Sequence, residues 1–512
     1  MTAESGAQLP SVRRGARPPL IRLLPDLGLG AAAATGLAPF GLWFLALPAL
    51  AALIWRAARA TPAGAFWHML VAGIGWFGLG LCWIVEPFLV EPEIYGWMAP
   101  FALVLMAVGG GLFWAVPATL AARLTPRWRA RAATIPAALV LSDWLRGWIF
   151  TGFPWALTGH VWVDTPVAQL AAWGGAIGLG ALTLTMAALP TLLWRASGPH
   201  ARGVIPGTAA AIVLLGAAWA AGLDRLATPM APDTPHVVRI VQPDAEQHLK
   251  WDPEWSAIFY RRLLDLSARP GPHDLTIWPE TAVNFLLNDA ATVTPTLAAA
   301  SGGPLVLGIQ RREDSRYYNS LVALDAAGAV TQTYDKFHLV PFGEYMPWGD
   351  ALAVIGITAF AAQQGNGYSA GPGPTVMRAG ALPPFQPLIC YEAIFPQHLR
   401  NLPTRPAWLL QATNDGWFGR ISGPHQHLAQ ARLRAIETGL PLMRAANTGI
   451  SAAIDPYGRL RQTLDLGEVG IIDAALPAPL PATFWLAWGP LPVLIVLAGI
   501  LGLGAMTGRR RR

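Results

Sequence analysis

Charged residues are scarce in this chain. Only 13% of its 512 residues are Asp, Glu, Lys or Arg, whereas 53% are hydrophobic, and the mean hydropathy is +0.39. An average soluble domain carries roughly 25% charged residues. The composition therefore excludes a soluble globular protein for the chain as a whole and favours a protein with large membrane-embedded segments.

Cysteine is almost absent as well, with Cys82 and Cys390 as the two examples. Cys82 lies in an apolar run, GWFGLGLCWIV, where a free cysteine usually packs as a small hydrophobe. Cys390 lies far away in a polar part of the chain. We therefore expect no structural disulfide, and Cys390 becomes a candidate for chemistry.

Apolar segments long enough to approach the roughly 20 residues of a membrane span recur along the chain. We predict eight spans, of which the first two are short: 27–39, 42–56, 66–85, 97–121, 132–150, 167–194, 204–223 and 484–506. No small-residue cleavage site follows the first segment, so it is interpreted as a retained span and not as a signal peptide.

Arginine clusters flank these segments on alternate sides. They precede the first span and follow the second, fourth, sixth and eighth, a pattern that places both termini in the cytoplasm, with only Arg146 near the opposite side. The net charge of +6 is thus explained by topology, and no nucleic-acid partner is expected. We divide the chain into a basic cytoplasmic tail (1–24), seven spans (25–225), a non-cytoplasmic domain (234–476), an eighth span (484–506) and a second basic tail (507–512).

The segment 234–476 has the pattern of an α/β domain. Short β-rich runs such as VVRIVQ (237–242), LTIWPE (275–280), VTQTYDK (330–336) and PLICYEAIF (387–395) alternate with helical patterns near 253–268, 291–300 and 425–438. Three of these runs contain or end on reactive side chains, namely Glu280, Lys336 and Cys390. Catalytic groups of α/β folds gather at the carboxyl ends of strands, and a carboxylate, an ammonium and a thiol together can perform nucleophilic catalysis without a metal.

Four motifs carry a resemblance to a known family. WPE (278–280), KFHLVPFGEYMP (336–347), CYE (390–392) and NDGWFG (414–419) resemble the apolipoprotein N-acyltransferase family, a membrane-embedded branch of the nitrilase, or carbon–nitrogen hydrolase, superfamily. The resemblance extends from about Leu27 to Met506. It implies an αββα sandwich domain mounted on a polytopic helical bundle.

The resemblance also implies a Glu-Lys-Cys triad. Glu280 is then expected to be the general base and Cys390 the nucleophile that holds the acyl chain as a thioester. Lys336 is expected to stabilise the oxyanion, together with the backbone N–H of Tyr391. No metal or organic cofactor is implied.

Four supporting positions are carried over in the same way. Glu344 matches a second carboxylate that supports Lys336, and Tyr391 and Glu392 match positions beside the nucleophile. Trp251 matches a tryptophan near the substrate entrance. The implied acyl donor is a phospholipid, typically phosphatidylethanolamine, and the implied acceptor is the amine of a diacylglyceryl apolipoprotein, at the periplasmic face of a bacterial inner membrane.

Two other functions share part of this pattern. A membrane-anchored nitrilase-type amidase that hydrolyses small amides would use the same triad, although it would need neither eight spans nor the apolar stretch 352–362, which we interpret as a lid or a core helix. A transporter or scaffold with an inactive domain would be expected to carry polar groups at mid-membrane, and few are present. His425 and His427 have no Cys or acidic ligand beside them in sequence, so no metal site is predicted.

Overall fold

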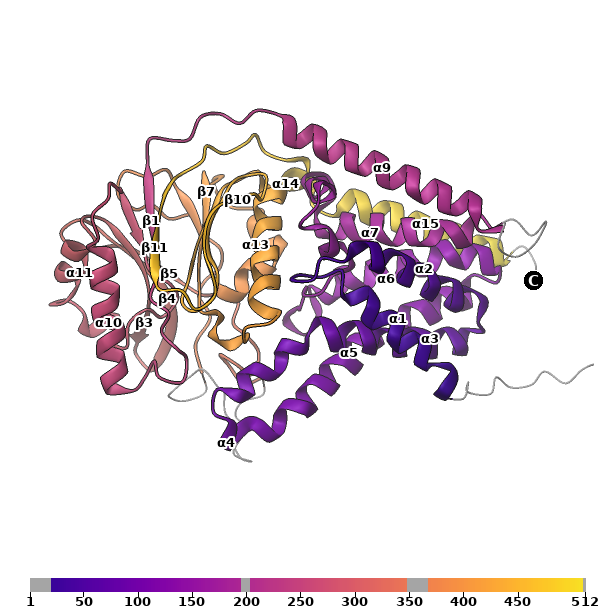
Figure 1. The fold of residues 1–512 in the computed structure, drawn as a ribbon, viewed down its shortest axis with the longest axis horizontal. Helices are drawn as coiled ribbons and strands as arrows, with labels where there is room; N and C mark the ends of the chain where they lie inside the picture. The colour runs from indigo at the N-terminus through magenta and orange to yellow at the C-terminus, as the bar shows by residue number, and fades with distance from the viewer. Residues whose placement is uncertain (1–19, 195–202, 348–366, 510–512) are drawn as a thin grey trace, which may run out of the picture.

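The computed structural model describes residues 20–194, 203–347 and 367–509, and these residues form two parts that lie side by side (Figure 1). The first part is a bundle of helices, and the second is built on two β-sheets. The chain runs through the bundle, crosses to the sheets after helix α9 (Ile205–Ala227), and returns to the bundle at its C-terminal end. The predicted stretch 352–362 lies outside the described residues.

Each predicted apolar segment contains a helix. The main ones are α1 (Leu24–Ala34), α2 (Trp43–Arg59), α3 (Pro62–Gly80), α5 (Ala99–Leu124), α6 (Trp128–Arg146), α7 (Ala171–Leu192), α9 and α15 (Leu491–Arg509). By length and apolar composition, four helical stretches within the described residues could cross a membrane: 62–80, 92–124, 166–192 and 205–227.

The number of predicted spans, eight, is larger than these four stretches, and helix length explains part of the difference. Helix α1 has 11 residues and α2 has 17, which is short for a bilayer. The segment predicted as one helix over 484–506 is two helices, α14 (Phe484–Trp488) and α15, because Gly489 adopts a left-handed φ of 59° immediately before Pro490.

Glycine lets neighbouring helices of the bundle approach closely. A Cβ at Gly73 of α3 would lie 2.5 Å from the Cα of Gly111 in α5, and a Cβ at Gly75 would lie 2.1 Å from the carbonyl oxygen of Leu27 in α1. Contacts between small residues are the usual way in which helices associate in lipid. Helix α3 is therefore fixed between α1 and α5 by positions that admit no larger side chain.

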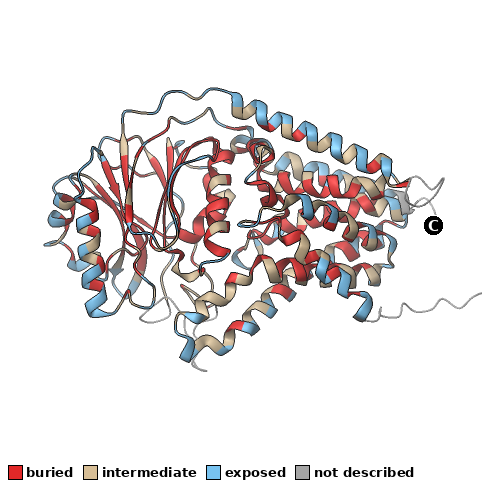
Figure 2. Ribbon diagram, in the orientation of Figure 1, coloured by how far each residue is buried: buried red, intermediate tan, exposed pale blue. Residues whose placement is uncertain are grey.

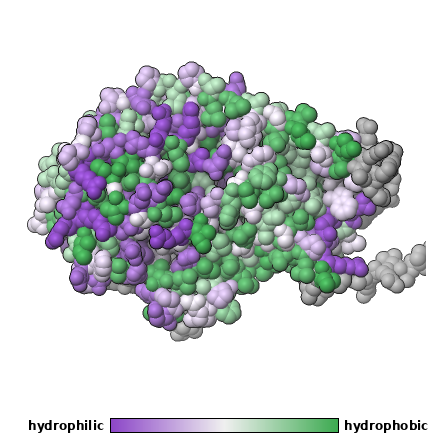
Figure 3. Space-filling model, viewed as in Figure 1, coloured by the Kyte–Doolittle hydropathy of each residue, from purple (hydrophilic) through white to green (hydrophobic). Residues whose placement is uncertain are grey.

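The outer faces of the bundle are apolar and uncovered. Ile212 and Val213 of α9 are 64% and 71% exposed, and α9 is largely pale blue in Figure 2. Hydrophobic residues dominate the visible surface of the helical part, whereas hydrophilic residues gather on the sheet part (Figure 3). Such a surface is stable in lipid and costly in water.

The described residues of the second part form eleven strands in two sheets. The strands are β1 (Val237–Gln242), β2 (Leu275–Ile277), β3 (Leu305–Glu313), β4 (Arg316–Leu324), β5 (Val330–Asp335), β6 (Phe385–Ile389), β7 (Trp408–Thr413), β8 (Leu442–Ala446), β9 (Ser451–Ile454), β10 (Leu460–Leu464) and β11 (Gly470–Ala475). One sheet has the order β11-β1-β2-β3-β4-β5, and the other β10-β9-β8-β7-β6.

Helices cover the outer face of each sheet, which gives four layers (Figure 1). Helices α10 (Pro253–Ser267) and α11 (Thr294–Ala300) cover the six-stranded sheet, and α13 (Gly423–Thr438) covers the five-stranded sheet. One core set joins the two sheets and includes Ile240, Val306, Ile389, Leu410 and Met443. Two further sets lie between sheet and helix, one around Leu263 and Trp278, the other around Leu409 and Leu428.

Helix α13 also forms the junction with the bundle. Its Glu437 Oε1 accepts the backbone N–H of Ala176 in α7 at 2.9 Å, and its Gln426 Oε1 accepts the indole N–H of Trp155 at 2.6 Å. Gln426 also donates to the carbonyl of Ala38 at 3.1 Å. Buried hydrogen bonds of this kind fix the sheet part in one position against the helices.

Candidate active site

The two sheets bring the ends of three strands to one place. Glu280 follows β2 and Lys336 follows β5 of the six-stranded sheet, while Cys390 follows β6 of the five-stranded sheet. All three side chains are buried, with exposed fractions of 7%, 1% and 5%. Residues predicted from separate strand ends thus form one cluster.

The backbone at Cys390 departs from the predicted strand over 387–395. Strand β6 ends at Ile389, and Cys390, with a φ of 48°, begins a 3₁₀ helix that runs to Ile394. The Glu392 carboxylate accepts the N–H of Ile389 at 2.8 Å and so closes this tight turn. A left-handed conformation costs a residue other than glycine about 1–3 kcal/mol and is found mostly at functional sites.

Lys336 is enclosed by two carboxylates. Its Nζ lies 2.8 Å from Glu344 Oε2 and 3.5 Å from Glu280 Oε1. Burial disfavours the charged ammonium, but the charges of Glu344 and Glu280 outweigh that effect and raise the pKa of Lys336 above its usual value. Lys336 is therefore a permanent cation in this site.

Two asparagines orient the carboxylates, and one of them, Asn319, was not predicted from the sequence. Asn319 of β4 donates its amide to Glu280 Oε1 at 2.7 Å and to Glu344 Oε1 at 3.1 Å. The backbone N–H of Asn414 donates to Glu280 Oε2 at 2.9 Å. Asn319 lies beside Ser320 in the polar first half of β4 (RYYNSLVAL), and such a pattern does not by itself specify a site.

The Cys390 thiol is held in its neutral form. Burial raises the pKa of Cys390, the negative charge of Glu280 raises it further, and the positive charge of Lys336 opposes both. A thiol in this environment needs a base at the moment of reaction. Glu280 is near enough for its charge to act on the thiol, which fits it for that task.

Glu392 and Tyr391 fix the loop that carries Cys390. Glu392 Oε1 accepts the N–H of Phe337 at 2.9 Å and the hydroxyl of Tyr334 at 2.8 Å. Burial raises the pKa of Glu392 to about 7, and these donors oppose that shift. The Tyr391 hydroxyl donates to the carbonyl of Gly152 in the bundle at 3.0 Å. The loop is thus tied both to the segment after Lys336 and to the helical part.

A second lysine lies at the same site and was also missed. Lys250 and Lys336 are the two lysines of the sequence. Lys250 is 6% exposed, and its Nζ donates to the backbone carbonyl of Glu280 at 3.4 Å. Trp251, the predicted entrance residue, follows it and is half-buried. The small number of lysines was the signal that could have singled out Lys250.

The described residues contain no group of three or more His, Cys, Asp and Glu side chains that could hold a metal ion. His427, in helix α13, instead lies against the Cys390 loop, and its Nε2 is 3.1 Å from the carbonyl oxygen of Cys390. Its Nδ1 is 2.9 Å from Asp415 Oδ1. His427 is therefore a hydrogen-bonding partner of the loop backbone.

Family comparisons divide the chain in the same way as the fold. Residues 29–189 match the family model for the apolipoprotein N-acyltransferase N-terminal domain, and residues 253–480 match the model for carbon-nitrogen hydrolase. An apolipoprotein N-acyltransferase of Caulobacter vibrioides is 39% identical over 511 residues, covering 95% of each chain. One of Bradyrhizobium diazoefficiens is 38% identical over 521 residues, covering 96% of each chain.

Solved structures of smaller proteins match about half of this chain. A CN-hydrolase superfamily protein of Xanthomonas campestris is 22% identical, with a TM-score of 0.36, and covers 52% of this chain and 97% of its own. An amidase of Nesterenkonia sp. AN1 is 16% identical, with a TM-score of 0.35, and covers 49% of this chain and 94% of its own.

Proposed function

Because the chain belongs to the apolipoprotein N-acyltransferase family, we propose that it moves a fatty acyl chain from a phospholipid to the N-terminal amine of diacylglyceryl-cysteine apolipoproteins. The observation that carries the mechanism is the buried Lys336 ammonium between Glu280 and Glu344, beside Cys390. The reaction is ping-pong, and a thioester on Cys390 divides one difficult ester-to-amide transfer into two easier steps.

In the first step the Cys390 Sγ attacks the ester carbonyl carbon of the donor while Glu280 takes the thiol proton. Lys336 stabilises the oxyanion, a contribution typically of about 10²–10³-fold per donor. The carbon–oxygen bond to glycerol then breaks, the leaving alkoxide takes the proton from Glu280, and lysophospholipid departs.

In the second step the neutral amine of the acceptor attacks the thioester carbonyl carbon. Glu280 takes the proton that the amine loses, and Lys336 again stabilises the oxyanion. The carbon–sulfur bond breaks, the amide forms, and Glu280 returns the proton to Cys390 Sγ. General-base catalysis of this kind typically contributes about 10²–10⁴-fold.

The membrane part holds this site at the surface from which both substrates come. In this proposal the eight predicted segments, the short helices α1 and α2 among them, cross the bacterial inner membrane, with the arginine clusters in the cytoplasm and the sheet part on the periplasmic face. Phosphatidylethanolamine is the donor, and no metal or cofactor takes part.

The test is the intact mass of the purified protein after incubation with dioleoyl phosphatidylethanolamine, with and without hydroxylamine. We expect one oleoyl chain to be added, hydroxylamine to remove it, and Cys390→Ala to prevent it. No adduct, together with release of ammonia from small amides, would replace the proposal with a membrane-anchored amidase.

A further inference from the structure

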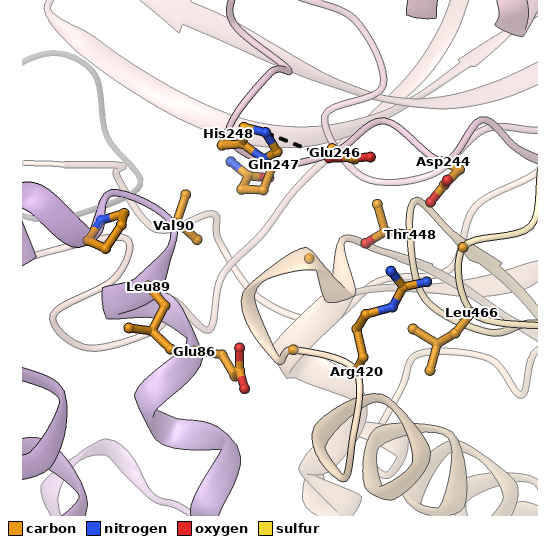
Figure 4. A pocket seen from close by; sticks show the side chains of 14 residues that line it. Glu86, Leu89, Val90, Asp244, Glu246, Gln247, His248, Arg420, Thr448 and Leu466 are labelled. Carbon is orange, nitrogen blue, oxygen red and sulfur yellow. Dashed lines mark ion pairs between the residues drawn. The ribbon is translucent and has the colours of Figure 1, made fainter. Parts of the chain in front are cut away.

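A cavity of about 480 Å³ opens between the helical part and the sheet part, and no residue of the triad lines it (Figure 4). The helical part contributes Glu86 and the apolar residues Leu89 and Val90. The sheet part contributes Arg420, and the remaining polar walls include Asp244, Glu246 and Thr448. Sites for small ligands usually have about 300–1,000 Å³.

The cavity is lined by opposite charges that come from different parts of the chain. Within the described residues, neither Glu86 nor Arg420 forms an ion pair, and the one pair drawn in Figure 4 joins Glu246 to His248 at 3.7 Å. A carboxylate and a guanidinium that line one cavity without pairing to each other are available to a ligand that carries both charges.

Each of the two charged side chains lies against a glycine that makes room for it. A Cβ at Gly419 would lie 2.3 Å from Glu86 Cδ, and a Cβ at Gly467 would lie 2.6 Å from an Nη atom of Arg420. Both glycines have left-handed φ values, 66° and 73°, which other residues rarely adopt. Glu86 and Arg420 therefore each lie close against the backbone of the sheet part.

Hydrogen bonds connect the cavity wall to the proposed base. Gln247 lines the cavity, and its Oε1 accepts the side-chain amide of Asn414 at 2.6 Å. The backbone N–H of Asn414 donates to Glu280 Oε2 at 2.9 Å. A ligand in contact with Gln247 is thus separated from the Glu280 carboxylate by one residue.

We propose that this cavity binds the zwitterionic headgroup of the donor phospholipid, with the phosphate at Arg420 and Thr448 and the ammonium at Glu86. The inference rests on the proposed function and names the part of the donor that is recognised. An anionic headgroup would satisfy Arg420 but leave Glu86, Asp244 and Glu246 facing further negative charge. The acceptor has an N-terminal amine that matches Glu86 but no phosphate for Arg420, so the donor headgroup is the substrate group that satisfies both charges.

The experiment measures thioester formation by the full-length protein, using dioleoyl phosphatidylethanolamine and dioleoyl phosphatidylglycerol in separate reactions. We expect wild type to favour phosphatidylethanolamine and Glu86→Gln to lower the ratio of the two kcat/KM values about tenfold, as for loss of one charge-assisted hydrogen bond. Arg420→Gln should slow acylation by both lipids, and Arg420→Lys should recover part of the rate. Glu93→Gln and Arg316→Gln, exposed and outside the cavity, are the matched controls.

A second measurement follows transfer from the preformed acyl-enzyme to a diacylglyceryl lipopeptide. Slow transfer with unchanged acylation in Glu86→Gln and Arg420→Gln would overturn the proposal and assign the cavity to the acceptor. Unchanged donor preference in Glu86→Gln would overturn it as well. Failure of wild type to form a thioester with any phospholipid contradicts the proposed function itself, and so the two failures are distinguishable.

Discussion

The Nε2 atom of His427 lies 3.1 Å from the carbonyl oxygen of Cys390, so a fully buried imidazole contacts the backbone of the proposed nucleophile. Its Nδ1 faces the Asp415 carboxylate at 2.9 Å, and Arg444 forms an ion pair with the other oxygen of Asp415. The Gln411 side-chain amide nitrogen, which lies 3.0 Å from the same Nε2, donates to the carbonyl oxygen of Cys390 at 3.4 Å. These side chains lie against the backbone carbonyl of Cys390 and hold that residue in its left-handed conformation.

Replacing His427 tests that positioning role. In His427→Ala the carbonyl of Cys390 loses its nearer side-chain partner and keeps only the longer bond from Gln411. We expect the acylation kcat to fall about tenfold to a hundredfold while KM for the lipid changes little, because small misplacements of a reacting group are costly. Single-turnover acylation, followed by intact mass, measures the step. A lowered Tm with an unchanged kcat would show that the network stabilises the fold alone.

The two cysteines should respond in opposite ways to replacement. Cys390→Ala is expected to abolish acyl transfer while the protein stays folded, because no other thiol lies in the site. The Sγ atom of Cys82 in the helical part lies 3.4 Å from the hydroxyl of Ser422 in the sheet part. We expect Cys82→Ala to change the activity less than twofold. Acyl transfer to a lipopeptide, scored by mass, checks both. Full activity of Cys390→Ala would contradict the thioester mechanism.

Lys336 has a structural and a chemical role that a double variant can separate. Lys336→Met leaves Glu280 and Glu344 as buried carboxylates without their cation, and breaking a buried pair costs about 3–5 kcal/mol. Activity should fall about 10²–10³-fold or more with loss of the oxyanion donor. Adding Glu344→Gln removes one of the uncompensated charges, so we expect it to recover Tm without recovering activity. Recovery of activity in the double variant would exclude Lys336 as the oxyanion donor.

Hydrophobic patterning was sufficient to predict much of the sheet part. The run predicted at 237–242 is β1, and the helix predicted at 253–268 is α10 to within one residue. In each segment the spacing of hydrophobic residues is regular throughout, and the segment ends at polar or turn residues. The run 387–395 was predicted wrongly beyond Ile389. The apolar pattern of the sequence continues beyond Ile389. Backbone N–H groups, however, donate hydrogen bonds to the side chain of Glu392, which lies within the same run, and the strand ends there.

Residues defined by tertiary contacts escaped the sequence analysis. Asn319 lies 39 residues from Glu280 and 25 from Glu344, and only the pairing of β4 with its neighbours brings the three side chains together. No metal site was predicted at His427, but its contacts with the Asp415 carboxylate and the carbonyl of Cys390 were not predicted either. The arrangement of strands in space, which single-sequence patterns do not contain, decides both cases.

Lys250 predicts a pH dependence of stability. Burial lowers the pKa of Lys250 from 10.5 to about 8, and the charge of Glu280 only partly opposes it. Below pH 8 the lysine is protonated in the folded and unfolded states alike, and the folded state bears the cost of a buried charge. Between about pH 8 and pH 10.5 the folded state releases the proton first, so the free energy of unfolding rises, by about 3 kcal/mol at about 1.4 kcal/mol per pKa unit. Lys250→Met lacks this gain, so Tm of wild type minus Tm of the variant should increase by a few degrees from pH 7 to pH 10. A pH-independent difference would mean that the Lys250 pKa is not lowered in the folded protein.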